Sequence, residues 1–388
     1  MALRTYFPLS DQTVIFTALP VLTGLISPHK DYLLNIAMIS LYLPSESKIG
    51  SGYQAHYMGN AMTRRGHSVT MFSPCQPPED ALYKTVVVNP GKRLRTFGFA
   101  WKLRSVDYSG FDAIHAHGDD YWLWGKRRYP IHVRTMHGSC LAEAAHIPSL
   151  NGKLRMFMLG LSEILATKVA DRTVCVSQNT VKYYPWLKDV IMNGVDTAAF
   201  RPSAPDGSER EALPTILFVG TYHNRKRGKL LMEAFDTVIR PALPDARLWM
   251  VCESAPEMLG VSVFNRIPLD QLTDLYRRSW AFCLPSSYEG FGVPYIEAMA
   301  SGCPVVATPN VGAVEVLGAG KYGTIVEPDQ LGSAILGLLK DSTARASWTQ
   351  KGLERVQEFA WDHIVDQYEN VYAELQAARD RRFGKRGA

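Results

Sequence analysis

The sequence of 388 residues lacks the signatures of several large protein classes. Its six cysteines are scattered, and none forms a C-x-x-C pair or lies at metal-ligand spacing from a histidine, which excludes a disulfide scaffold and the common zinc modules. No repeat and no low-complexity tract is present. Most of the cysteines lie in apolar runs such as 173–176 and 281–284. This placement predicts reduced core thiols in a cytosolic protein.

A strong charge of one sign is also missing. The chain carries 42 Lys and Arg residues against 37 Asp and Glu, a net charge of +5. This surplus is too small to indicate nucleic-acid binding, and none is expected. The distribution is uneven, because residues 1–200 hold 21 basic and 14 acidic side chains, whereas the rest of the chain is nearly neutral. The first half is therefore expected to meet an anionic acceptor or the membrane surface that presents one.

The chain has no uninterrupted apolar segment of the ~20 residues that a membrane span needs. Residues 14–28 are apolar and uncharged, but Pro20, Gly24 and Pro28 break them. Only Arg4 precedes this stretch, so a signal peptide is not expected. We interpret residues 1–32 as a poorly defined N-terminal extension, with a membrane-touching segment as the alternative. The expected location is the cytoplasm, with peripheral association at the inner face of the membrane kept open.

What the chain does have is ordinary globular composition, 46% hydrophobic and 20% charged, with apolar runs that alternate with amphipathic stretches. This alternation predicts an α/β protein with mostly parallel sheets. A proline-rich, polar stretch at 201–214 interrupts it and reads as a linker. The expected domains are 33–200 and 215–360, followed by a C-terminal helix with a basic tail over 361–388. We place expected strands and helices at these ranges: strands 33–43, 68–73, 111–116, 131–136, 172–176, 190–192, 215–219, 247–252, 281–284 and 305–307; helices 52–65, 154–170, 229–239, 269–278, 295–301, 331–340 and 361–382.

The most informative loop follows the apolar run 281–284 and carries Glu289, Gly290 and Gly292 before a helix that begins near Pro294. Backbone N–H groups at such a helix start favour an anion such as a phosphate. A carboxylate beside a phosphate is better suited to accept hydrogen bonds from hydroxyl groups. Phosphate and hydroxyl binding in one loop, with Glu297 one turn further on, indicates a nucleotide-sugar. Glu289 would then contact the hexose and Glu297 the ribose.

The same loop resembles the signature of the family 4 retaining glycosyltransferases, in which Glu-x7-Glu is followed by Ala-Met-Ala-x-Gly-x-Pro-Val-Val-Ala. Residues 193–196, 218–226 and 359–362 are similar to other elements of this family. The resemblance implies the GT-B fold, an α/β architecture of two Rossmann-like domains whose parallel sheets face a central cleft, with a C-terminal helix that crosses back to the first domain. It also implies metal-independent transfer of a hexosyl group, with retention, from a nucleotide-diphosphate sugar, UDP- or GDP-linked by preference, to a glycan, lipid-linked or small-molecule acceptor. No cofactor beyond the nucleotide-sugar co-substrate is expected.

The resemblance also assigns roles to residues. His117, Glu289 and Lys226 are the expected catalytic residues, and His137, Gly138 and Asn193 are expected on the acceptor side. Thr221 stands where the family often has an arginine after the glycine. The expected donor-binding residues are Gly50, Gly52, Gly220, Thr221, Arg225, Lys226, Ile267, Glu289, Gly290, Phe291, Gly292, Val293 and Glu297.

Several alternatives stay open beside this interpretation. An epimerase or phosphorylase of the same fold, and a nucleotide-sugar binder without activity, are the competing functions. A metal site made by His115, His117 and His137 is disfavoured because no carboxylate or cysteine completes the set. Asp119 and Asp120 are expected to form a solvated loop pair.

A Rossmann dehydrogenase is disfavoured as well, because no third glycine follows Gly50 and Gly52 at the fingerprint spacing. The basic runs 92–95 and 126–128 lie near Trp101, Trp122 and Trp124 in the sequence. A solvated face is the usual explanation of such runs. Basic groups beside exposed aromatic rings also suit an anionic interface, so membrane contact is the alternative.

Overall fold

The computed structural model describes residues 33–45, 50–91, 95–124, 130–144, 147, 149–202 and 209–384. The predicted N-terminal extension, 1–32, lies outside these ranges. So do residues 92–94 and 125–129, which include most of the two basic runs. All statements below concern the described part of the chain.

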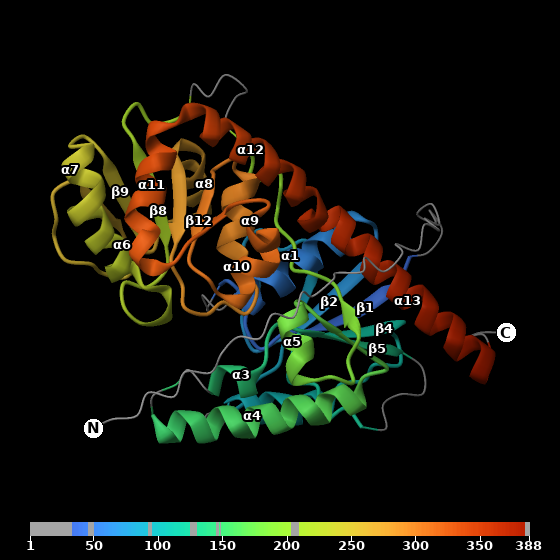
Figure 1. Ribbon diagram of the computed structural model, residues 1–388. Helices are drawn as coiled ribbons and strands as arrows, with labels where there is room; N and C mark the ends of the chain where they lie inside the picture. Colours follow the sequence, from blue (N-terminus) through green and yellow to red (C-terminus); the bar gives the residue numbers. More distant parts are fainter. Residues whose placement is uncertain are drawn as a thin grey trace. The chain divides into compact units, whose positions relative to one another are not determined.

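The first domain contains a seven-stranded sheet in the order β3-β2-β1-β4-β5-β6-β7, and all of its strands are parallel. Figure 1 shows this sheet with its helices, α4 being the long helix at the lower edge of the view. The strands are β1 (Asn35–Ile39), β2 (Ser68–Ser73), β3 (Lys84–Val87), β4 (Ala113–Ala116), β5 (Ile131–Met136), β6 (Arg172–Cys175) and β7 (Asp189–Val190). The helices are α1 (Gly50–Arg64), α2 (Arg95–Leu103), α3 (Cys140–Ala144), α4 (Leu150–Val169) and α5 (Gln178–Tyr183).

The second domain repeats this construction with a six-stranded parallel sheet in the order β10-β9-β8-β11-β12-β13. Its strands are β8 (Thr215–Val219), β9 (Arg247–Val251), β10 (Val261–Phe264), β11 (Ala281–Leu284), β12 (Val305–Ala307) and β13 (Thr324–Ile325). Its α-helices are α6 (Gly228–Ala234), α7 (Arg240–Ala242), α8 (Leu269–Arg278), α9 (Val293–Ala300), α10 (Val311–Val316), α11 (Leu331–Lys340) and α12 (Ser342–Val356). A π-turn, η2 (Phe235–Ile239), joins α6 to α7, and short 3₁₀ turns are η1 (Asn224–Lys226), η3 (Gly318–Gly320), η4 (Pro328–Gln330) and η5 (Gln357–Phe359).

Central strands of both sheets are buried on both faces, because helices cover each face of a parallel sheet. Every residue of β4, β5 and β11 is buried. Continuous apolar runs mark such strands in a sequence, which explains why β8 and β11 have the predicted bounds. The bounds of β2 and β5 are also as predicted, although polar residues interrupt both strands. The edge strands β3 and β10 contain exposed residues and have no such run. The sequence patterns therefore did not predict them.

The last helix, α13 (Trp361–Phe383), leaves the second domain and packs against α1 and β5 of the first. It runs across the view in Figure 1 to the first sheet. Asp366 forms an ion pair with Arg65 at 2.7 Å, and Glu369 accepts a hydrogen bond from the His67 ring at 3.0 Å. The crossing back to the first domain is as predicted.

The chain enters α13 through a tight junction. The amide of Gln54 in α1 makes two hydrogen bonds of 3.0 Å to the backbone of Gly194. A side chain on Gly194 would collide with the Trp361 indole, because a Cβ there would lie 2.5 Å from the ring. Glycine is therefore required where the two crossings between the domains touch.

All six cysteines are unpaired thiols, and five of them are buried, as predicted for core positions. None of the helices in the described ranges has both the length and the apolar character needed to cross a lipid bilayer.

Candidate active site

A cleft with a cavity volume of about 730 Å³ is lined by residues from both domains. Loops at the carboxyl ends of the parallel strands form its walls, the position where ligands bind in sheets of this kind. Fourteen of the seventeen residues assigned to the site from the sequence line it: Gly50, His117, His137, Gly138, Asn193, Arg225, Lys226, Ile267, Glu289, Gly290, Phe291, Gly292, Val293 and Glu297.

The remaining three, Gly52, Gly220 and Thr221, do not line the cleft. A Cβ on Gly52 would lie 2.8 Å from the carbonyl oxygen of Tyr42, so this glycine permits α1 to approach the end of β1 closely. A Cβ on Gly220 would lie 3.1 Å from that of Lys226. The hydroxyl of Thr221 donates to the His223 carbonyl at 2.9 Å, within its own turn.

The wall formed by the second domain is built around Glu289. Lys226 Nζ lies 2.7 Å from Glu289 Oε1, and the Arg225 guanidinium lies 3.1 Å from the same oxygen. Burial alone would raise the pKa of Glu289, but the two cations outweigh it and hold that pKa below its usual value. Burial also lowers the pKa of Lys226, an effect that Glu289 only partly offsets. Two cations and one carboxylate thus form a compact charged cluster at the cleft, which we call the Glu289 cluster.

Hydrogen bonds between loops hold the Glu289 cluster in position. Ser287 N–H donates to the Arg225 carbonyl at 2.8 Å, and the Arg225 guanidinium donates to the Tyr288 carbonyl at 2.9 Å. Arg227 adopts a positive φ of 52°, and its guanidinium donates to the Pro285 carbonyl at 2.6 Å. The loop after β8 is therefore tied to the loop after β11. The positions of its two cations depend on that attachment.

The loop after β11 leads into α9 through Gly292, whose φ of +102° is accessible mainly to glycine. A Cβ there would also lie 2.5 Å from the Tyr295 ring. Pro294 stands in the first turn, where its missing N–H costs nothing. This arrangement is the predicted helix start with unpaired backbone donors.

Glu297 lies one turn into α9 and pairs with neither cation in the described structure. Tyr276 donates to its carboxylate at 3.0 Å. Burial raises the pKa of Glu297 to about 7, so near neutral pH this carboxyl group exchanges between its charged and neutral forms.

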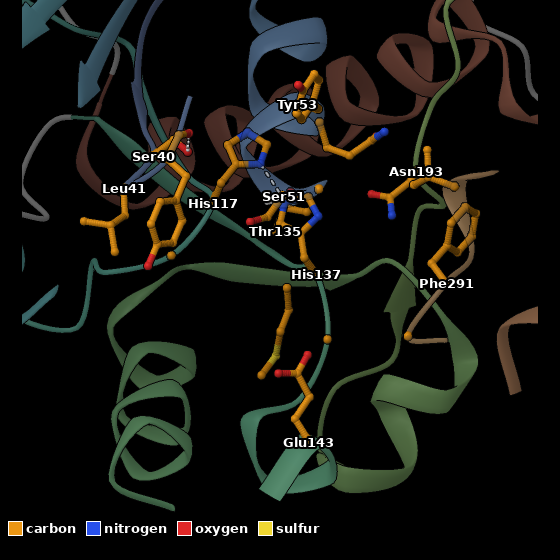
Figure 2. A pocket seen from close by; sticks show the side chains of 18 of the residues that line it. Ser40, Leu41, Ser51, Tyr53, His117, Thr135, His137, Glu143, Asn193 and Phe291 are labelled. Atoms are coloured by element: carbon orange, nitrogen blue, oxygen red, sulfur yellow. Dashed lines mark hydrogen bonds between the residues drawn. The ribbon is translucent and has the colours of Figure 1, made fainter. Parts of the chain in front are cut away.

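The wall formed by the first domain is a stack of imidazoles at the ends of β4 and β5. Figure 2 shows His117 and His137 pointing toward each other, with Asn193 and Phe291 on the opposite side of the view. His117 Nδ1 and His137 Nε2 share a hydrogen bond of 2.9 Å, and the His115 ring stacks on His117 with centroids 4.9 Å apart. Burial lowers the pKa of all three, that of His137 to about 4 and that of His115 to about 3. The stack is uncharged at neutral pH.

His115 does not line the cleft, and hydrogen bonds to residues of β5 and α13 fix the position of its ring. Its Nε2 lies 2.7 Å from the Thr135 hydroxyl, which in turn lies 2.7 Å from the Tyr368 hydroxyl, while Nδ1 bonds to Tyr372. Both tyrosines belong to α13. Within the described ranges, no three His, Cys, Asp or Glu side chains are grouped so that they would hold a metal ion.

The expectation of a solvated Asp119–Asp120 pair is wrong. Asp120 is fully buried, forms an ion pair with Arg134, and lies 3.0 Å from His132 Nε2. Arg134 stabilises the ionised carboxylate against burial, and the pKa of Asp120 is lowered. Burial raises the pKa of the neighbouring Asp119 to about 7, and its φ is +63°. Asp120 thus belongs to the interior, whereas Asp119 is partly exposed and lines the cleft.

Several lining residues were missed by sequence reasoning. Arg134 interrupts the apolar run of β5, and a charged residue within a buried strand is a signal of a buried partner. Glu163 lies in the middle of α4 and accepts hydrogen bonds from the Cys140 N–H at 3.0 Å and the Tyr184 hydroxyl at 2.7 Å. Other lining residues that carry no sequence motif are Tyr53, Tyr57, Glu143, Arg155 and Ser162.

Comparison with known proteins identifies the family. A sequence model described as Glycosyltransferase Family 4 matches residues 50–199, and one described as Glycosyl transferases group 1 matches residues 213–341. The phosphatidyl-myo-inositol mannosyltransferase of Mycolicibacterium smegmatis is 31% identical over 379 residues, covering 88% of this chain and 94% of that protein. The O-antigen chain mannosyltransferase B of Escherichia coli is also 31% identical, but over 40% of this chain and 45% of that protein.

Solved structures agree on the fold. Sucrose-phosphate synthase of Thermosynechococcus elongatus superposes with a TM-score of 0.72 at 23% identity, over 89% of this chain and 99% of that one. Anabaena HepE in complex with UDP-glucose gives 0.70 at 17% identity, over 88% and 100% of the two chains. The fold is GT-B, and the chain belongs to the group 1, family 4 glycosyltransferases.

Proposed function

We propose that the protein is a retaining glycosyltransferase that moves a hexosyl group from a nucleotide-diphosphate sugar to an acceptor held by the first domain. One observation carries this proposal: the Glu289 cluster and the start of α9 face the His117–His137 pair across a single cleft. Family membership supports the transferase activity. The UDP-glucose bound in HepE supports a nucleotide-diphosphate donor.

The donor fits the second-domain wall. Its diphosphate would lie against the N–H groups of Gly292 and Val293, beside the cations of Lys226 and Arg225. Glu289 would then exchange part of its contact with these cations for hydroxyl groups of the hexose. Glu297 would accept from the ribose diol, and Ile267 lies at the position proposed for the base. Gly50 supports this arrangement as a cleft-lining backbone position without a side chain.

In the proposed reaction, the bond between the anomeric carbon and the diphosphate oxygen breaks, and its electron pair leaves with the diphosphate. The acceptor oxygen forms the new bond on the same face, and its proton passes to the departing phosphate oxygen. Lys226 and Arg225 neutralise the charge that develops there, an effect of several kcal/mol in a site from which water is excluded. His117 stays uncharged and orients the hexose and the attacking hydroxyl, because burial prevents it from holding an extra proton.

The acceptor would enter beside His137, Gly138 and Asn193. This side of the cleft also carries Glu143 and Glu163, and carboxylates accept hydrogen bonds from hydroxyl groups. The lining therefore favours a hydroxyl-rich acceptor group, such as a sugar or polyol. Any anionic part of the acceptor would lie further out, where Arg155 is exposed.

No metal ion takes part in this proposal, because the cations of Lys226 and Arg225 occupy the role that a divalent ion has in other transferases. Assays after dialysis against EDTA test this assignment. Full activity is expected, and a loss that Mg²⁺ or Mn²⁺ restores would contradict it.

The first experiment is a thermal-shift screen of the purified chain with UDP-, GDP-, ADP- and TDP-sugars, because a ligand that binds only the folded state raises the melting temperature. The selected donor is then assayed with sugar and polyol acceptors, and the anomeric configuration of the product is determined by NMR. An inverted product would refute retention.

Incubation with the donor alone separates the remaining alternatives. An epimerised sugar indicates an epimerase, and turnover that requires inorganic phosphate indicates a phosphorylase. Tight donor binding without turnover on any acceptor indicates a binding protein and would refute the proposed transfer.

A further inference from the structure

The long helix α4 exposes a row of large apolar side chains that nothing in the described chain covers. Its members recur at helical spacing and are between 45% and 81% exposed: Leu150, Leu154, Phe157, Met158 and Leu161. A spacing of three or four residues places them along one side of the helix. An apolar row of this size on the outer side of a surface helix marks an interaction surface.

The inner side of α4 belongs to the site. Arg155, Leu159, Ser162 and Glu163 line the cleft, and they lie on the side of the helix turned away from the apolar row. The row is thus separated from the acceptor part of the cleft by one helix, about 10 Å thick with its side chains. Anything that binds the row would therefore lie next to the part of the cleft where the acceptor is proposed to bind.

Aromatic rings extend the row at the end of α4. Trp186, 44% exposed, donates from its indole N–H to the Thr167 hydroxyl at 3.2 Å. Lys168 lies over the same ring, 5.4 Å from its centroid. Tyr183, in the neighbouring α5, is also exposed. Tryptophan and tyrosine rings of this kind are enriched at the interface between lipid headgroups and acyl chains.

The charges around the row are mostly positive. Exposed lysines and arginines surround it on α4, on α5 and in the segment after α5: Lys153, Arg155, Lys168, Lys182 and Lys188. The single acidic residue of α4 is Glu163, which is turned to the cleft. A second copy of the chain would bring like charges together in a twofold contact, because such a contact pairs the same surface with itself. An anionic lipid surface complements the row and its charges at once.

We infer that the outer side of α4, continued by Trp186 and Tyr183, docks on an anionic membrane and so brings a membrane-borne acceptor to the first-domain wall. The assignment of an acceptor rests on the proposed function, whereas the docking itself does not. This surface differs from the basic runs 92–95 and 126–128, most of which lie outside the described residues.

The test uses the full chain and vesicles of phosphatidylcholine with or without phosphatidylglycerol. We expect sedimentation with the anionic vesicles only, weakened by salt because surface attraction is screened. The double variant Leu154→Asp/Phe157→Asp should lose about tenfold or more of the bound fraction, because it removes two apolar anchors and adds repulsion. Leu259→Asp is the matched control: Leu259 is a 76% exposed leucine in the second domain, and its replacement should change nothing.

Other occupants of the surface give different results. A dimer in analytical ultracentrifugation that the double variant dissociates would assign the surface to a second copy and overturn the inference. A monomer that binds no anionic vesicle would mean that another part of the same chain covers the row, and this result would overturn it too. Vesicle binding that the double variant retains would also contradict it.

Donor turnover is measured in parallel with a water-soluble acceptor. The double variant should keep the rate of the unmodified chain in this assay, since neither residue lines the cleft. Loss of vesicle binding with normal turnover supports the docking surface. Absence of turnover in every chain, with vesicle binding intact, refutes the proposed function and leaves the docking surface standing.

Discussion

The two walls of the cleft handle charge in opposite ways. On the second-domain wall, Lys226, Arg225 and Glu289 carry two positive charges and one negative charge at the surface of the cleft, a net charge of +1. On the first-domain wall, burial keeps His117 and His137 uncharged. One wall is therefore suited to hold a charged diphosphate and the other to orient neutral hydroxyl groups. If the donor is the proposed nucleotide-diphosphate sugar, a nearly neutral half of the sequence could bind it through two cations and a helix start, without a bulk positive charge.

The first-domain wall depends on a buried ion pair for its stability, and this dependence gives the largest expected effect. Asp120→Asn removes the charge that compensates the buried Arg134. Loss of one partner of such a pair costs about 3–5 kcal/mol in the free energy of unfolding. Urea unfolding of the variant measures it. Glu233→Gln is the control, because Glu233 pairs with Lys229 at the surface, and it should change stability by less than about 0.5 kcal/mol.

The second-domain wall should instead show its importance in catalysis. Lys226→Ala removes the cation closest to Glu289 and to the proposed leaving group. The expected loss in kcat/KM is about 10²–10³-fold, as for other groups that stabilise developing negative charge. Lys229→Ala, one turn further on and exposed, should retain normal kinetics. A loss below about threefold in the Lys226 variant would remove this residue from the mechanism.

A pH series on Glu297 tests whether burial also controls ionisation on the second-domain wall outside the Glu289 cluster. Burial raises the pKa of this carboxyl to about 7 in the folded protein, against 4.5 for an exposed glutamate. The folded state therefore holds the proton more tightly, and this contribution to stability is complete below about pH 4.5 and is lost as the pH rises to about 7. Relative to Glu297→Gln, the unmodified protein should lose up to about 1.4 kcal/mol per pH unit in that window.

Urea unfolding of both chains at several pH values between 4 and 8 measures this difference. Comparison with the Gln variant is needed because the buried histidines act in the opposite direction. Their lowered pKa values weaken the folded state as the pH falls below about 6.5. A difference between the two chains that does not change with pH would mean that Glu297 ionises as it does in the unfolded chain.

The smallest effect is expected for the positioning role of His137. Its ring shares a hydrogen bond with His117, so the position of the proton on one ring is coupled to that on the other. His137→Asn should lower kcat about tenfold while the KM for the donor stays unchanged. The nitrogen chemical shifts of the His117 ring should change in the same variant. His363→Asn, at an exposed position of α13, should alter neither kcat nor these shifts. An unchanged spectrum would mean that the contact does not orient His117.

Buried elements of the fold were predicted from the sequence more accurately than exposed ones. Buried strands with apolar runs, such as β8 and β11, had the predicted bounds. The edge strands β3 and β10 and the polar helix α12 were missed because few of their residues are buried. For the site, fourteen of the seventeen positions predicted from motifs line the cleft. Arg134 and Glu163 lie outside these motifs. The charge of Arg134 within a buried strand indicates a buried partner but not its identity, and Glu163 carries no motif because it is the fold that brings α4 to the cleft.

The wrong expectation that Asp119 and Asp120 are solvated also arose from a tertiary contact that no local motif shows. Two adjacent carboxylates in a loop are usually hydrated, and only the partner on β5 changes that expectation. No local sequence pattern around Asp120 indicates that it pairs with Arg134, fourteen residues later on β5.

The crossing of α13 limits how this protein can be divided. The hydroxyls of Tyr368 and Tyr372 complete the hydrogen bonds behind His115, although more than 200 residues of chain separate them from β5 and β4. If the gene were cut at the linker and the halves produced separately, the first half would lack the helix that closes its own sheet. Residues of α13 are thus part of the first domain, and a nascent chain cannot complete that domain until the second domain has been synthesised.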